Sequence, residues 1–312
     1  MRIVVTGGTG FIGREIVHRL LQTGDDPLVV TSRNSEAPGF WRSRIEVVQA
    51  FAGDALSLAR AFTRADVVIH AIQFPNHPVE DPSRGRTYLE VDGKGTEVAV
   101  RAAKQVGVRR FVYLSGAGAG QGRKENWFLA KDRAEAAIRE SGLEYAILRP
   151  SWIYGPHDRS MNRFVFFCRY LPLVPVIGDG KTRVDPILVD DVARCIADAA
   201  RREDCKDKTF ELGGPERLSM NEIIKTVQSL LRGRRPFPFG ALARLTGQPL
   251  LHQPAGLMKL LALPMTLLPE PILSPGAIDF ILQEVAIDPK PAVDYFGFPF
   301  KTLRQGLEGY LP

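Results

Sequence analysis

The chain is poor in cysteine. Its 312 residues include three, and Cys168, Cys195 and Cys205 have neither the spacing of a metal site nor that of a redox pair. A disulfide-rich scaffold and a zinc–cysteine centre are therefore excluded as organising features. Each cysteine is expected to be a small core or surface residue, which fits a reducing compartment. The sequence predicts no metal site.

Long apolar runs are also missing. No run of about eighteen apolar residues occurs, so we expect no membrane-spanning helix. The first residues lack a charged stretch followed by an apolar one, so we expect no signal peptide. Together with the cysteine usage, these features predict a cytoplasmic protein, and they leave a peripheral position at a membrane open.

Charge is only mildly biased. The net charge is +6 and the isoelectric point is about 9.3. The basic residues are scattered and form no stripe interleaved with aromatic residues, so a nucleic-acid partner is not expected. A hydrophobic content of 45% is ample for a buried core, in one large domain or two joined ones.

Apolar runs alternate with amphipathic stretches through the first half of the chain. Strands are predicted at 3–6, 27–31, 45–48, 66–70, 110–114 and 145–148, and helices at 12–23, 55–62 and 85–106. Strands that alternate with helices pair in parallel. The sequence therefore predicts an α/β fold with a doubly wound parallel sheet.

Prolines and glycines become dense after Pro150. A helix is predicted to begin at Asp190 and Asp191, which are good N-cap residues, and a strand follows at 209–212. Ser219, with Glu222 three residues later, predicts a capping box at the start of another helix. This part is expected to be smaller and mostly helical.

The first predicted strand runs directly into a glycine-rich turn and then a helix. Gly7 permits a sharp turn, Gly10 allows close approach to phosphates, and Gly13 lets the helix lie close to the strand. The helix N-terminus offers free N–H groups and partial positive charge. The arrangement predicts a site for a dinucleotide pyrophosphate, formed by Thr6, Gly7, Gly10, Phe11, Ile12 and Gly13.

The spacing Thr-Gly-x-x-Gly-x-x-Gly resembles that of the extended and atypical short-chain dehydrogenase/reductases (SDRs). The segment from Leu148 to Pro156 resembles the one that passes the nicotinamide in extended members. The resemblance implies a Rossmann domain over 1–155 and about 183–212. It also implies a smaller substrate- or partner-binding region over about 156–182 and 213–312.

Arg33 bears on the choice of cofactor. It follows the second predicted strand, where an acidic residue would bind a ribose 2′-hydroxyl and a cation would bind a 2′-phosphate. NADP(H) is therefore favoured over NAD(H), unless Arg33 is a solvated loop residue. The resemblance implies further cofactor contacts from Ser32, Asp54, His70, Ala71, Ile72, Ser115, Lys131, Pro150 and Ile153. The alternatives are a helix cap for Asp54, packing for His70 and a surface position for Lys131.

The expected catalytic pair is incomplete. In the SDR family a tyrosine donates a proton, and a lysine four residues later lowers its pKa and holds the nicotinamide ribose. Here Lys131 matches the lysine, but Trp127 replaces the tyrosine, and an indole N–H cannot supply a proton. Ser115 is the remaining hydroxyl near the expected substrate-orienting position, and it could instead face the cofactor. Tyr154 is an alternative phenol, although it is expected to pack.

Arg33, Trp127 and the proline-rich apolar tail together resemble the atypical SDR branch that contains the NADPH-binding accessory subunit of respiratory complex I. The resemblance implies either a tight NADP(H) binder with an assembly role or a reductase of a hydrophobic, quinone- or isoprenoid-like substrate. A reductase of the isoflavone-reductase-like type that uses Lys131 is an alternative. A nucleotide-sugar epimerase or dehydratase is another, against which Arg33 and Trp127 weigh.

Residues 236–278 are apolar, rich in proline and poor in charge. One interpretation is a helical pair that covers the cleft for a small hydrophobic substrate. The other is a surface that meets a lipid, a membrane or a protein partner. The sequence does not determine the oligomeric state.

Overall fold

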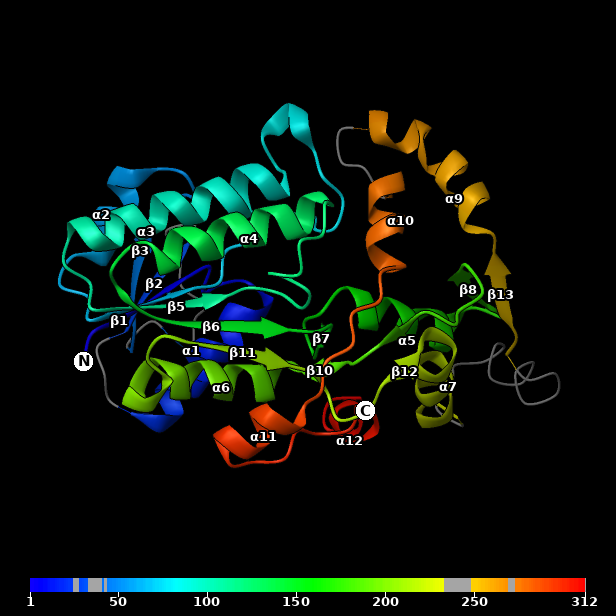
Figure 1. Ribbon diagram of the computed structural model, residues 1–312. Coiled ribbons are helices and arrows are strands. Elements are labelled where there is room, and N and C mark those ends of the chain that lie inside the picture. The colour runs from blue at the N-terminus through cyan, green and yellow to red at the C-terminus, as the bar shows by residue number, and fades with distance from the viewer. Residues whose placement is uncertain (25–27, 33–40, 42–43, 233–247, 269–272, 312) are drawn as a thin grey trace.

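Seven parallel strands form the central sheet of the part of the chain that the structure describes (Figure 1). The computed structural model describes residues 1–24, 28–32, 41, 44–232, 248–268 and 273–311. The strands, in sheet order, are β11 (Lys208–Leu212), β6 (Glu144–Pro150), β5 (Arg110–Leu114), β4 (Val67–His70), β1 (Ile3–Thr6), β2 (Leu28–Ser32) and β3 (Glu46–Gln49). The chain order reverses between β1 and β4, which is where open parallel sheets bind ligands.

Helices cover both faces of this sheet (Figure 1). On one face are α1 (Phe11–Thr23), α6 (Val189–Arg201) and α11 (Lys290–Phe296), and on the other are α2 (Ala55–Phe62), α3 (Gly95–Gln105) and α4 (Asn126–Arg139). Successive residues of β1 enter opposite cores, because strand side chains alternate between faces. The predicted doubly wound α/β fold is confirmed.

The later part of the chain has its own core beyond the carboxyl ends of the strands. Its helices are α5 (Ser160–Tyr170), α7 (Met220–Leu230) and α12 (Leu303–Glu308). Its short strand pairs, among the described residues, are β7 (Ile153–Tyr154) with β10 (Ile187–Leu188), β9 (Arg183–Val184) with β12 (Leu218–Ser219), and β8 (Val174–Ile177) with β13 (Leu250–Gln253). This packing joins segments that are distant in sequence.

Among the described residues of the apolar segment 236–278, helix α9 (Ala255–Ala262) and the start of helix α10 (Pro275–Ile281) lie at the outer side of this part. Lys259 of α9 pairs with Asp279 of α10. The described residues also form the short helical segments η2 (Pro82–Arg84), η3 (Tyr88–Lys94), η4 (Glu203–Cys205) and η5 (Pro264–Leu267). None of the described helices is both long and apolar enough to cross a bilayer.

The structure corrects two local predictions. The helix predicted at 85–106 begins as a π-helical segment, η3, and becomes α-helical only at Gly95. In α6 the N-cap is Leu188, so Asp190 and Asp191 lie in the first turn, where they complement the helix dipole. By contrast, the capping box of Ser219 and Glu222 is confirmed.

Candidate functional site

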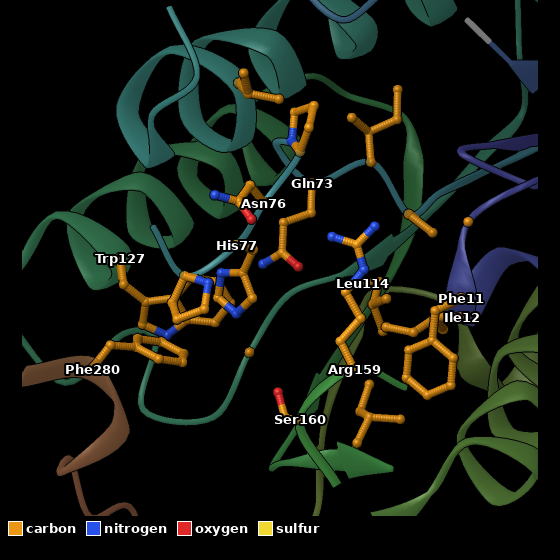
Figure 2. Close-up of a pocket in the computed structure, with 18 of the residues that line it drawn as sticks. Phe11, Ile12, Gln73, Asn76, His77, Leu114, Trp127, Arg159, Ser160 and Phe280 are labelled. Atoms are coloured by element: carbon orange, nitrogen blue, oxygen red, sulfur yellow. The ribbon is translucent and has the colours of Figure 1, made fainter. Parts of the chain in front are cut away.

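A cavity of about 950 Å³ opens at the carboxyl ends of the central strands (Figure 2). Its walls come from the turn after β1, the loops after β4, β5 and β6, and helices α4, α5 and α10. The cavity therefore spans both parts of the fold at the point where the strand order reverses. Within the described residues, no group of three histidine, cysteine or acidic side chains could hold a metal ion.

The glycine turn forms one end of the cavity. Gly7 has φ of +69°, and a Cβ there would lie 2.8 Å from the Ala71 carbonyl oxygen. A Cβ on Gly13 would collide with the Gly7 carbonyl oxygen. Helix α1 begins after Gly10 without a side-chain cap, so its first N–H groups are free to bind an anion. Both the space and the chemistry fit a pyrophosphate.

Most of the residues predicted to contact a cofactor line this cavity. They are Gly7, Gly10, Phe11, Ile12, Gly13, Ala71, Ile72, Ser115, Lys131, Pro150 and Ile153. Arg33 lies outside the described residues. Ser32 is the last residue of β2, next to the cavity-lining Thr31.

Thr6 and His70 point into the fold instead. The Thr6 hydroxyl lies 2.9 Å from His70 Nδ1, and both side chains are buried. The imidazole stacks on the ring of Tyr113. Burial, reinforced by the positive charge of Lys131, lowers the pKa of His70 to about 3. Neither residue is among the described residues that line the cavity, because the alternation of strand side chains turns them to the helical layer.

Asp54 is used as a helix cap. Its carboxylate accepts hydrogen bonds from the backbone N–H groups of Leu56 and Ser57 at the start of α2. These bonds lower the pKa of Asp54, with the Ser57 backbone making the largest contribution. The structure thus favours the capping role that the sequence left as the alternative to a cofactor contact.

Lys131 lines the cavity, and two buried side chains bind its ammonium group. Its ammonium group lies 3.2 Å from Asp92 and 3.4 Å from the Tyr113 hydroxyl, and all three side chains are buried. Burial by itself would lower the pKa of Lys131, but Tyr113 and Asp92 outweigh it and raise that pKa. A lysine kept protonated in this way is suited to donate hydrogen bonds to ribose hydroxyls and is a poor proton source.

The phenol beside Lys131 belongs to Tyr113 of β5. Tyr113 is 1% exposed and is not among the described cavity-lining residues. Burial also raises the pKa of its hydroxyl. Although an aromatic hydroxyl contacts the lysine, it faces the helical layer, so a substrate in the cavity would not meet it. Tyr154 is likewise buried, and its hydroxyl donates to the Thr302 carbonyl at 3.3 Å.

The Ser115 hydroxyl is engaged in a different contact. It donates to Glu135 at 2.6 Å, and Glu135 also pairs with Arg149 at 2.6 Å. Burial opposes ionisation of Glu135, but the hydrogen bonds from Arg149 and Ser115 prevail and lower the pKa of that carboxyl. Ser115 is part of the cavity wall, yet its hydroxyl is directed to an ionised acceptor within the fold. This is not the substrate-facing position expected for the family serine.

An aromatic cluster lies at the other end of the cavity, where three of its members, His77, Trp127 and Phe280, line the wall. It comprises Phe74, His77, Tyr88, Trp127 and Phe280, with neighbouring ring centroids 4.7–6.2 Å apart. Figure 2 shows His77, Trp127 and Phe280 gathered on one side of the cavity, opposite Phe11 and Ile12. The Lys131 ammonium lies 4.7 Å from the centre of the Trp127 ring. An apolar substrate would fit this end.

Several cavity residues carry no signal that singles them out in the sequence, among them His77, Arg159 and Phe280. His77 sits in a loop without a recognisable motif, and Phe280 reaches the site only because α10 packs there. Arg159 follows the Gly-Pro-His-Asp segment, and Figure 2 shows its side chain directed into the cavity. The sign available in the sequence is that this cationic residue comes soon after the segment 148–156, which resembles the one that passes the nicotinamide.

Comparison with known proteins agrees with this geometry. Residues 7–203 match a family described as NAD(P)H-binding. The chain is similar to the mitochondrial NADH dehydrogenase [ubiquinone] 1 alpha subcomplex subunit 9 of Arabidopsis thaliana, with 29% identity over 247 residues, 75% of this chain and 60% of that protein. It is also similar to a ceramide reductase of Caulobacter vibrioides, with 32% identity over 195 residues, 61% of this chain and 58% of that protein.

The matched stretches thus span about three fifths of these two relatives. Among solved structures, a UDP-glucose 4-epimerase from Thermotoga maritima shares the fold, with a TM-score of 0.72 and 21% identity over 99% of this chain and 98% of that one. The predicted resemblance to atypical SDRs of the complex I accessory-subunit type is confirmed by the relatives.

Proposed function

Because the chain belongs to the family of NAD(P)H-binding proteins, we propose that it binds NADP(H) and reduces a carbonyl group on a mostly apolar substrate. One observation carries the proposal: a single cavity joins the glycine turn to the aromatic cluster. The nicotinamide cofactor supplies the hydride. The protein supplies a phosphate site at one end, a charged lysine in the middle and apolar rings at the other end. The similarity to a ceramide reductase also supports a reductase.

NADP(H) is the proposed form of the cofactor because Arg33 follows β2, where the adenosine ribose binds in Rossmann folds. The test is to titrate the protein with NADPH and NADH and compare the two dissociation constants. NADPH is expected to bind at least about tenfold more tightly, and Arg33→Ala should remove that difference, because the 2′-phosphate loses its charged partner. Equal affinities in the unaltered protein would contradict the preference.

The reductase itself is tested by a single-turnover reaction. Protein loaded with NADPH is mixed with phenanthrenequinone or with a long-chain ketone, and the nicotinamide absorbance is followed. Hydride loss that depends on the carbonyl compound and saturates with it is expected. Bound NADPH that remains reduced with both compounds would count against a reductase.

A second candidate is a subunit that holds NADP(H) and joins a larger assembly. A specific surface favours it: Leu257, Leu260 and Leu261 of α9, and Leu263 just after it, are each at least 50% exposed. Exposed leucines on one short helix are unusual for a surface that meets only water. The similarity to the complex I subunit supports the same role.

This candidate commits to a protein partner on α9. Replacing Leu257 and Leu260 with glutamine should abolish association measured by co-purification from the native source, while NADPH affinity stays unchanged. Flotation with phosphatidylglycerol vesicles separates the partner from a lipid surface. Flotation that the same pair of substitutions abolishes would favour a membrane and contradict a protein partner.

A further inference from the structure

The reductase proposed above needs a group that stabilises negative charge on the carbonyl oxygen. Trp127 stands where the family's phenol would be, and the phenol of Tyr113 faces away from the cavity. His77 lines the cavity and is the candidate for this role. Its ring centroid lies 5.7 Å from that of Trp127, and the ring carries a polar N–H. This inference rests on the proposed function and assigns a residue to it.

Contacts on three sides fix the orientation of the His77 ring. Phe74 and Phe280 each present an edge-to-face contact, with centroids 5.8 and 4.9 Å away. The Tyr88 hydroxyl lies 3.0 Å from His77 Nδ1. The other nitrogen, Nε2, has no hydrogen-bond partner among the described residues. The ring is therefore held at one nitrogen and left with the second available to a molecule in the cavity.

The Tyr88 contact also decides which nitrogen carries the proton. A phenol O–H is a better donor than an imidazole N–H, and an imidazole nitrogen is a better acceptor than a phenol oxygen. Tyr88 therefore donates to Nδ1, and in the neutral ring the proton resides on Nε2. Tyr88 keeps its own proton because burial, with the charges of Asp92 and Glu80, raises its pKa.

Burial, together with one neighbouring positive charge, keeps the ring neutral. Burial, reinforced by the positive charge of Lys131, lowers the pKa of His77 to about 3. The His77 ring contacts Tyr88 of η3, Trp127 of α4 and Phe280 of α10. The Lys131 ammonium lies against the Trp127 ring. Glu80 binds the Tyr88 backbone N–H and adds a more distant negative charge. A neutral imidazole that donates from Nε2 is thus the expected state across the physiological pH range.

We propose that His77 is a catalytic residue that donates a hydrogen bond from Nε2 to the substrate carbonyl oxygen, and that Tyr88 is its positioning residue. When hydride adds to the carbonyl carbon, the C=O π electron pair moves to oxygen. The Nε2–H bond and the Lys131 ammonium stabilise that charge. The oxygen then takes a proton from water, which enters past the exposed Gln73 and Asn76 at the rim. The nicotinamide is oxidised, the carbonyl becomes an alcohol, and hydroxide is left in the solvent.

The experiment compares the unaltered protein with His77→Leu, Tyr88→Phe and the control His18→Gln. His18 lies on α1 outside the cavity wall, with a side chain 58% exposed. Single-turnover rates with NADPH and phenanthrenequinone are expected to fall about 10²-fold in His77→Leu, the loss typical of one oxyanion donor. The NADPH dissociation constant should not change, and His18→Gln should react normally.

A second measurement does not depend on activity. Imidazole ¹⁵N chemical shifts, assigned by the signal lost in His77→Leu, should show Nε2 protonated and no titration between about pH 8 and about pH 5. In Tyr88→Phe the shifts should move toward a mixture of tautomers, with a smaller fall in rate.

The outcomes separate this inference from the proposed function. If the unaltered protein retains its hydride, both are overturned. If it reacts and His77→Leu reacts at the same rate, only the role of His77 is overturned. A proton found on Nδ1 in the unaltered protein overturns the positioning role of Tyr88 and the donor role of Nε2.

Discussion

The Lys131 ammonium lies 3.2 Å from the Asp92 carboxylate, and neither side chain is more than 3% exposed. A buried ion pair is a weak source of net stability, but removal of one partner leaves an uncompensated charge inside the protein. Asp92 reaches this position because η3 is a π-helical segment whose Gly93 packs against Ala130 of α4. The pair therefore links the local geometry of η3 to the cavity floor.

Asp92→Asn should lower the free energy of unfolding by about 3–5 kcal/mol, because the buried Lys131 would lose its carboxylate partner. The double variant Asp92→Leu, Lys131→Met should recover most of that loss. Urea unfolding followed by circular dichroism measures both. Equal destabilisation of the single and double variants would show that packing, not charge, dominates at this position.

Trp127→Tyr should increase carbonyl reduction, because it restores a phenol four residues before Lys131. General acid catalysis contributes about 10²–10⁴-fold, and a gain of at least about tenfold is expected in the single-turnover rate with phenanthrenequinone. Trp127→Phe is the matched control, since it removes the indole without adding a hydroxyl. A rate for Trp127→Tyr no higher than that of Trp127→Phe would contradict the assignment of this position.

Gly13→Ala should weaken NADPH binding by at least about tenfold, because the new Cβ collides with the Gly7 carbonyl oxygen and displaces the turn. Gly256→Ala on α9 is the control: a Cβ there has no neighbour within 4 Å. Isothermal titration calorimetry gives the affinities, and thermal unfolding checks that both variants are folded. Unchanged affinity in a folded Gly13→Ala protein would exclude the turn as the pyrophosphate site.

Stability should fall as the pH is lowered from neutrality. His70 and His77 both have pKa values lowered to about 3 in the folded protein, against an ordinary value of 6.5. Below pH 6.5 the unfolded chain therefore binds more protons than the folded one, and each histidine removes up to about 1.4 kcal/mol per pH unit until about pH 3. Above that range both are neutral in either state and contribute no pH dependence.

Urea unfolding at several pH values between about 7 and about 4 measures this slope. The variant His70→Asn, His77→Gln should show a shallower dependence, with the remainder due to carboxylates. An unchanged slope would mean that both imidazoles are accessible to protons in the folded protein.

The glycine turn could be predicted from sequence because its requirements are local. Gly7, Gly10 and Gly13 follow a strand and precede a helix, and their spacing alone determines that the backbone can approach phosphates. The replacement of the family tyrosine by Trp127 could also be predicted locally. Trp127 and Lys131 lie on one helix, so helical geometry sets the distance between them.

The directions of side chains on the strands were harder to predict. Thr6 and His70 end strands, as predicted, but the face that each presents depends on which helices cover the sheet. Ser115 lies on the cavity wall, yet Glu135 of α4 captures its hydroxyl. These outcomes depend on contacts between elements, which no local pattern contains.

By itself, the sequence determined a dinucleotide-binding α/β fold and the replacement of the proton-donating tyrosine, because both depend on spacing within one strand, turn or helix. Only the tertiary structure decided that Lys131 is paired with Asp92, that Tyr113 faces away from the cavity, and that His77 meets Phe280 beside Trp127. Those contacts join segments far apart in the chain. Their geometry follows from how the helical layers pack on the sheet, and the neighbouring residues in the sequence do not determine it.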